Sequence, residues 1–68
     1  MEQEVKYLIE VRSNFTQCAY YVDTIDGKEL YSLSPNDAKQ YSDIADANIK
    51  AVMLDTEKIK HQVIEHIF

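Results

Sequence analysis

The spacing of apolar residues changes part-way along the chain, across residues 33–47. Before this segment apolar side chains alternate in twos, the period of a half-buried strand. After it they recur at threes and fours, the period of an amphipathic helix. Residues 34–37 read Ser-Pro-Asn-Asp and end the strand region, because proline cannot donate to a strand ladder and Asn and Asp favour turns. The sequence therefore predicts one small α+β domain over residues 1–68, in which an antiparallel sheet carries one main helix on a single face.

Two strands separated by a loop are predicted in the first part of the chain. Residues 5–12 alternate between apolar and polar side chains, and residues 18–25 are rich in aromatic and β-branched residues. Residues 13–17 between them have the polar composition of a loop. The alternation places Val5, Tyr7, Ile9 and Val11 on one face of the first strand, and Lys6, Glu10 and Arg12 on the other.

A hairpin turn is predicted at Asp26-Gly27, and a third strand follows it. A two-residue type I′ turn needs positive φ at both central positions, and Asp-Gly adopts it at low cost. If pairing is regular beyond the turn, Val22 lies opposite Tyr31 and Tyr20 lies opposite Leu33. We expect these four side chains to share the core face of the sheet.

One helix is predicted after the sheet-forming region, beginning at Ser42. The Ser42 hydroxyl can cap the helix, and Asp43 and Asp46 in its first turn interact favourably with the helix macrodipole. We expect the helix to lie across the sheet face that carries Tyr20, Val22 and Tyr31. Its apolar stripe consists of Ile44, Ala47, Ala51 and Leu54, widened by Ala45, Ile49 and Val52.

Residues 58–68 fit two descriptions. Ile59, Val63 and Ile67 fall on one side of either a strand or a helix. The four β-branched residues of this segment favour a fourth strand. The alternative is a single helix that runs from Ser42 nearly to the end of the chain.

Charge and cysteine content limit the partners and the compartment. Twelve acidic residues against seven basic ones give a net charge of −5, which disfavours direct binding to nucleic acid. The single Cys18 cannot form an internal disulfide, so a reducing cytoplasm is expected. The first four residues are not basic, and no apolar run approaches the roughly 20 residues that cross a bilayer. We therefore expect neither export nor membrane insertion.

Residues able to carry catalysis or hold a metal are few and badly spaced. His61 and His66 lie on different faces of either a helix or a strand, so they do not suit a shared metal. Cys18 has no activating neighbour in the sequence, and we expect it to be an ordinary strand residue. One glycine cannot build a phosphate-binding loop, and no carboxylate pair stands out as an acid–base couple. The sequence predicts no enzymatic activity, no cofactor and no metal site.

A protein-binding patch is predicted on the second face of the sheet. Tyr21 points to this face together with Leu8 and Leu30, and tyrosine is enriched at protein interfaces. If no helix covers the face, an apolar patch with an acidic border is left exposed, and such patches mark interfaces with a partner or with a second copy. The expected partner-binding residues are Tyr21, Leu8 and Leu30 at the centre, and Asp23, Glu10 and Glu29 at the border.

The layout and the run Asn36-Asp37-Ala38-Lys39-Gln40-Tyr41 resemble small proteins encoded by phages and prophages of Gram-positive bacteria. The resemblance implies a mobile-element origin, the host cytoplasm, and an accessory role that modulates or inhibits a host protein. Some small acidic phage proteins block host nucleases or CRISPR effectors by occupying nucleic-acid-binding surfaces. We therefore expect a host protein with a basic surface as partner, occluded by the acidic patch. The alternative is a structural component that forms a homodimer through the same face.

Overall fold

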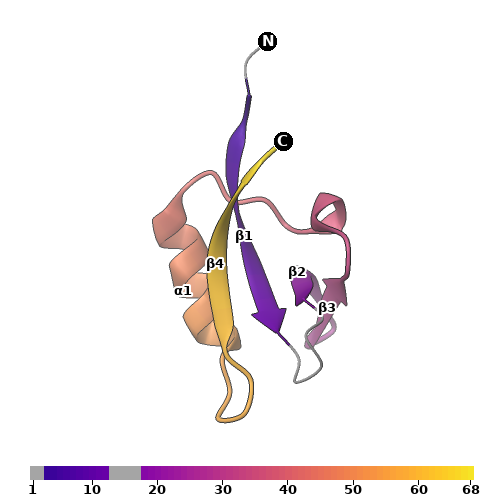
Figure 1. The fold of residues 1–68 in the computed structure, drawn as a ribbon. Helices are drawn as coiled ribbons and strands as arrows, with labels where there is room; N and C mark the ends of the chain where they lie inside the picture. The colour runs from indigo at the N-terminus through magenta and orange to yellow at the C-terminus, as the bar shows by residue number, and fades with distance from the viewer. Residues whose placement is uncertain (1–2, 13–17) are drawn as a thin grey trace.

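The computed structural model describes residues 3–12 and 18–68, which form an α+β domain (Figure 1). The predicted fold class is confirmed, and the C-terminal segment is a strand. The predicted loop at residues 13–17 lies outside the described residues. The elements are β1 (Val5–Arg12), β2 (Cys18–Ile25), β3 (Lys28–Ser32), the short 3-10 helix η1 (Pro35–Asp37), α1 (Ile44–Leu54) and β4 (His61–Ile67).

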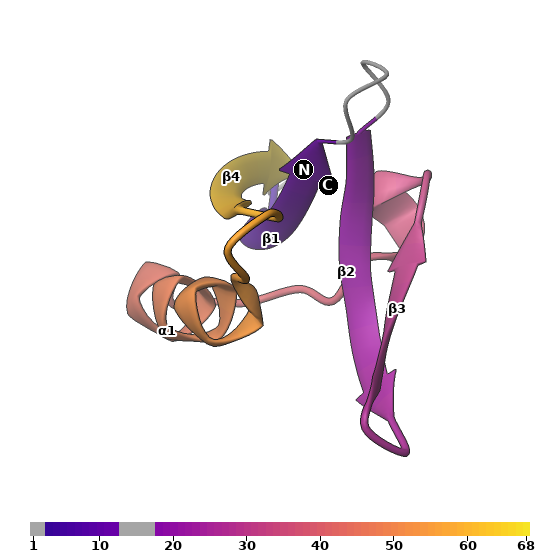
Figure 2. The ribbon, with the colours of Figure 1, turned by 90° about the horizontal axis from the view of Figure 1, so that it is seen from below.

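The strands form one antiparallel sheet in the order β3-β2-β1-β4. β4 pairs with β1 along nearly its whole length, from Val5 opposite Ile67 to Val11 opposite His61. α1 packs on one face of the sheet, mainly against β4 and less against β1. Figures 1 and 2 show α1 beside β4, on the opposite side of the molecule from the β2–β3 hairpin.

β1 and β2 separate after a short paired stretch. Only residues 10–12 of β1 pair with residues 18–20 of β2. Beyond this stretch Tyr41 takes the place of β2: the Tyr7 N–H donates to the Tyr41 carbonyl at 2.8 Å, and the Tyr41 N–H donates back at 2.9 Å. The Lys39 N–H donates to the Tyr21 carbonyl at 2.9 Å. The β2–β3 hairpin therefore projects away from the part built by β1, β4 and α1 (Figure 2).

The hairpin turn forms as predicted. Asp26 and Gly27 both have positive φ, at 52° and 76°. These angles match a two-residue type I′ turn, whose twist suits the right-handed twist of the flanking strands. The turn sets the pairing of β2 with β3 from its first residue pair.

A β-bulge at Val22 changes the register that the turn sets. Pairing is regular from the turn as far as Asp23 opposite Leu30, as predicted. The register then shifts by one residue, so that Tyr21 pairs with Tyr31 and Val22 is passed over. One extra residue turns every following side chain to the other face of the sheet. The predicted pairing of Val22 with Tyr31 is therefore wrong by one residue.

The core lies between α1 and the sheet face that carries Ile9 and Tyr21. Ile9 is 0% exposed and Tyr21 is 2% exposed. The prediction that α1 covers Tyr20 and Val22 is wrong, because the bulge turns Tyr21 rather than Tyr20 toward the helix. The core cluster consists of Ile9, Tyr21, Ala51 and Leu54, with Tyr41 and Val63 packed against it.

The helix begins one residue later than predicted. The N-cap is Asp43, whose carboxylate accepts a hydrogen bond from the Ala45 N–H at 2.9 Å. Ser42 instead accepts a hydrogen bond from the Lys6 ammonium at 3.0 Å. An aspartate at the N-cap satisfies a free N–H and also places negative charge at the positive end of the helix.

Candidate functional site

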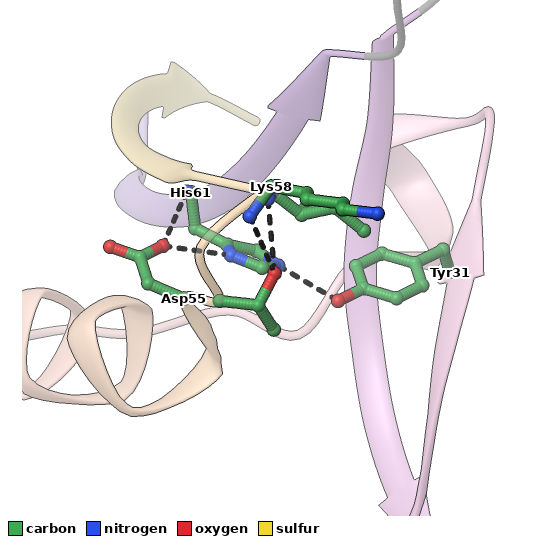
Figure 3. Close-up of polar contacts among 6 residues, drawn as sticks. Tyr31, Asp55, Lys58 and His61 are labelled. Atoms are coloured by element: carbon green, nitrogen blue, oxygen red, sulfur yellow. Dashed lines mark hydrogen bonds and ion pairs between the residues drawn. The ribbon is translucent and has the colours of Figure 1, made fainter.

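A chain of polar contacts joins three elements of the fold (Figure 3). Asp55 is the C-cap of α1, His61 is the first residue of β4, and Tyr31 lies in β3. The Asp55 carboxylate contacts His61 Nδ1 at 2.9 Å and accepts a hydrogen bond from the His61 backbone N–H. His61 Nε2 lies 2.8 Å from the Tyr31 hydroxyl. The neutral tautomer protonated at Nδ1 satisfies both contacts, because Nδ1 then donates to Asp55 and Nε2 accepts from Tyr31.

The turn before β4 holds this chain of contacts in place. The Thr56 hydroxyl accepts hydrogen bonds from the backbone N–H groups of Lys58 at 3.3 Å and Ile59 at 3.0 Å. The hydrogen bonds from the His61 backbone and ring lower the pKa of the Asp55 carboxyl, and the charge of Lys60 lowers it further. The carboxylate is therefore favoured in its ionised form in the folded protein.

The order carboxylate, imidazole, hydroxyl resembles the layout of nucleophile–base–acid catalytic groups. Two observations oppose such chemistry. Burial, the charge of Glu29 and the neighbouring Tyr21 raise the pKa of the Tyr31 hydroxyl, so it stays protonated at neutral pH. The His61 side chain is 1% exposed, which leaves a substrate no direct access to the imidazole. The contacts therefore serve to join α1, β3 and β4.

Sequence reasoning missed this chain of contacts, although one signal was present. A negative charge at the C-terminal end of a helix opposes the macrodipole, so Asp55 needs a partner there. From the sequence, His61 is weighed as a metal ligand and as a base for Cys18, but not as a partner of Asp55. Cys18 is half-buried at the start of β2, and His66 packs edge-on against Phe68 with ring centroids 4.5 Å apart. Among residues 3–12 and 18–68, no three His, Cys, Asp or Glu side chains gather as a metal site would need.

The patch predicted around Tyr21 does not exist as an exposed surface. Tyr21, Leu8 and Glu10 are 2%, 0% and 6% exposed. The bulge at Val22 turns Tyr21 into the core, and Leu8 lies in a central strand directly opposite Ile64 of β4. Of the other residues predicted for the patch, Leu30, Asp23 and Glu29 are exposed, and a binding role for them stays a prediction.

A different apolar surface is exposed on α1. Its outer stripe consists of Ala45, Asn48, Ile49, Val52 and Met53, at the spacing i, i+3, i+4, i+7 and i+8. Ile49 is 61% exposed, and Val52 and Met53 are each 71% exposed. Asn48 lines an open depression together with these three apolar residues. The buried face of α1 consists of Ala47, Ala51 and Leu54. The predicted stripe is therefore too wide, because its other members are exposed: Ile44, Ala45, Ile49 and Val52.

Acidic residues lie at both ends of the outer stripe. Asp43 and Asp46 lie at the start of α1, and Asp55 and Glu57 follow its end. The one lysine of α1, Lys50, lies over the Tyr21 ring with its Nζ 5.5 Å from the ring centroid. Residues 43–57 thus hold four carboxylates against one lysine, and that lysine interacts with the core.

The chain matches no protein-family model, no curated protein and no solved structure. Its geometry and sequence are thus the basis for assigning a function. Within the described part of the chain, α1 has 11 residues, and neither it nor any other helix has the length and apolar character needed to span a bilayer.

Proposed function

We propose that this chain is a protein-binding module that inserts the outer stripe of α1 into an apolar groove, rimmed by Lys and Arg, on another protein. The observation that carries the proposal is the exposure of Ile49, Val52 and Met53, at 61%, 71% and 71%. A helix that is apolar on two opposite faces normally packs on both sides. Here the sheet covers only one side of α1.

The spacing and charge of the outer stripe support this mode of binding. Amphipathic helices that bind in grooves use anchors at i, i+3, i+4 and i+7, and Ala45, Asn48, Ile49 and Val52 have this spacing. The carboxylates at both ends of the helix suit a basic rim, because complementary charge accelerates association and selects the partner. Met53 adds a flexible side chain that adapts to a groove.

The partner class follows from the charge, and its biological setting follows from the resemblance. A basic protein that handles nucleic acid, such as a nuclease or a CRISPR effector, fits an acidic ligand that occludes its surface. A phage or prophage origin, action in the host cytoplasm and the absence of enzymatic activity remain parts of this proposal. The alternative homodimer was predicted through the face of Tyr21 and Leu8, and it loses its basis because both residues are buried.

Photo-cross-linking tests the proposal. Benzoylphenylalanine replaces Met53 in one variant and Ile25, which is 53% exposed on the hairpin, in a matched control. Each protein is irradiated in lysate of a Gram-positive host at low and at high salt. We expect a cross-linked basic protein from the Met53 variant only, with less of it at high salt because salt screens the carboxylates.

A second pair of variants checks that the apolar side chains are required. Ile49→Asp with Met53→Asp should abolish capture, and Ile25→Asp should preserve it. All three positions are exposed, so circular dichroism should show folded protein in each case. The proposal is wrong if the double variant captures the same protein as the parent, or if the cross-link forms from position 25 instead of position 53.

A further inference from the structure

The outer edge of β4 has a defined set of outward-facing backbone groups. The Phe68 N–H donates to the Glu4 carbonyl at 2.9 Å, so even-numbered residues of β4 exchange hydrogen bonds with β1. The N–H and C=O groups of Val63, Glu65 and Ile67 therefore point away from β1. The Tyr7–Tyr41 pair confirms this pattern. Tyr7 lies opposite Glu65, but the Tyr7 N–H and C=O bond to Tyr41 on the far side of β1, so they do not bond to Glu65.

This edge lacks the features that usually protect a sheet edge. Outside the strand ladders, no backbone hydrogen bond among the described residues involves Val63, Glu65 or Ile67. This stretch begins just after His61, whose N–H donates to Asp55. β4 contains no proline and no bulge, and Glu65 is its only acidic or lysine side chain. Exposed edges are normally blocked by such features because they accept further strands.

α1 lies beneath the position that an added strand would occupy. Lys50 points toward Tyr21 of β2, and Asn48 points almost opposite to Lys50 around the helix, since successive residues turn by about 100°. The strand order places β2 and β4 on opposite sides of β1, so Asn48 and Ile44, one turn earlier, lie on the flank beyond β4. Figures 1 and 2 show α1 on the β4 side of the molecule, away from the β2–β3 hairpin.

α1 and β4 run side by side, with the end of α1 at the start of β4 and the start of α1 toward the end of β4. This arrangement places exposed apolar residues toward one end of the edge. Asp55 contacts His61 at one end. At the other end Ser42 contacts Lys6, which lies opposite His66. Ile44, 48% exposed, and Ile67, 57% exposed, therefore lie toward the same end of α1 and β4. Both leave apolar surface available to an added strand.

We propose that the outer edge of β4 binds an extended segment of a partner protein as a fifth strand, with an apolar residue, a Lys or Arg and an apolar residue at alternate positions. These three side chains lie opposite Val63, Glu65 and Ile67, and the basic one pairs with Glu65. This mode is β-strand addition, in which backbone hydrogen bonds give affinity and alternate side chains give specificity. It differs from groove binding by the outer stripe and does not depend on it.

A second copy of the chain fits this edge poorly. Antiparallel pairing of two β4 strands about a twofold axis puts both helices on the same face of the joined sheet. Each α1 packs mainly against its own β4. Adjacent strands lie only about 4.8 Å apart, whereas packed helices need about 8–10 Å between their axes, so the two helices would clash. In a register centred on Glu65, the two Glu65 carboxylates would also face each other without a basic partner. The edge therefore suits a strand that brings no helix with it.

Peptide titration monitored by amide NMR tests the proposal. The probe is the acetylated and amidated peptide Thr-Val-Thr-Lys-Thr-Val-Thr, and its control has Glu in place of Lys. A strand of this length buries less than the about 1,200 Å² of a standard interface, so weak binding is expected. Shifts at the amides of Val63, Glu65 and Ile67 should accompany binding, with about a two- to fivefold preference for the Lys peptide.

Three variants isolate the edge. Glu65→Lys should reverse the preference and favour the Glu peptide. Glu65→Pro removes an outward N–H and should weaken both peptides about tenfold, while proline at such an edge position leaves the fold intact. Glu29→Pro is the matched control on the outer edge of β3, because Lys28 flanks the turn and pairs inward, and it should bind as the parent does.

The possible results distinguish a peptide added at the edge of β4 from a peptide bound to the outer stripe and from a second copy of the chain. Shifts confined to the outer edge of β4 and to Ile44 and Asn48, with the reversal by Glu65→Lys, support the proposal. Shifts centred on Ile49 and Met53 overturn it and assign the peptide to the outer stripe. No shift at millimolar peptide also overturns it. Concentration-dependent shifts of the edge without peptide overturn it in favour of a second copy.

Discussion

Tyr21 should be the most sensitive tyrosine of this protein. Its ring is 2% exposed, meets the Tyr31 ring edge-on at 6.1 Å and carries Lys50 over its face. Replacing a buried aromatic residue by alanine costs about 3–5 kcal/mol. At about 0.05–0.15 kcal/mol per residue, a 68-residue domain has a total stability of only about 3–10 kcal/mol. Tyr21→Ala should therefore leave much of the protein unfolded at 25 °C.

Two further variants separate the contribution of the Tyr21 ring to stability from that of its hydroxyl and from that of the neighbouring tyrosine. Tyr21→Phe keeps the ring and removes the hydroxyl that lies 2.6 Å from Thr24 Oγ1, so it should cost about 0.5–1.5 kcal/mol. Tyr20→Ala changes the neighbouring tyrosine, which is half-buried on the other face, and should cost at most about 2 kcal/mol.

Urea unfolding followed by far-UV circular dichroism measures all three variants. The loss in free energy of unfolding should be largest for Tyr21→Ala. It should be much smaller for Tyr20→Ala, and for Tyr21→Phe it should be similar to or smaller than for Tyr20→Ala. An equal or larger loss for Tyr20→Ala than for Tyr21→Ala would refute the reasoning. That result would mean that no bulge turns Tyr21 toward α1 and that regular pairing from the turn is correct.

Three smaller perturbations test local contacts. Asp55→Asn should destabilise the protein at neutral pH. Folding lowers the pKa of the Asp55 carboxyl from 3.8, so the difference in stability between parent and variant should shrink as pH falls below that value. Urea unfolding midpoints at pH 7 and pH 3 would check this. Tyr31→Phe removes the hydroxyl partner of His61 Nε2 and should lower stability by about 1 kcal/mol, or about 4–8 °C in Tm, measured by thermal unfolding. Asp43→Ala removes the N-cap acceptor for Ala45 and should cost about 0.5–2 kcal/mol by the same assay, with no loss contradicting the cap.

The order of elements could be predicted because each has a local signal. Alternation marks β1, Asp26-Gly27 marks the turn, and β-branched residues mark β4. The bulge at Val22 has no such signal, since no glycine or proline lies beside it. A single unpredicted residue in the pairing then reversed the face assigned to Tyr21. The error lies in register, where one residue decides which side of a sheet is buried.

The candidate binding surface was visible in the sequence but was interpreted as core. At about 100° per residue, Ile49 points almost opposite to Ala47, and Val52 points about 100° away from Ala51. The helical period therefore separates both residues from the buried stripe of Ala47, Ala51 and Leu54. The periodicity does not show whether a second layer covers that outer side, and in the structure α1 packs on the sheet alone, mainly against β4 and β1.

The pairing of β1 with β4 governs when this protein can fold. The partners Val5 and Ile67 are separated by almost the whole chain, so the central strand of the sheet meets its neighbour only through a contact of very high sequence separation. During synthesis β1 stays without this partner until β4 has left the ribosome, while the local β2–β3 hairpin can form early. Loss of β4 would expose the edge of β1 from Val5 to Val11 and remove the main support of α1. Emergence of β4 is thus the step that commits the domain to its native state.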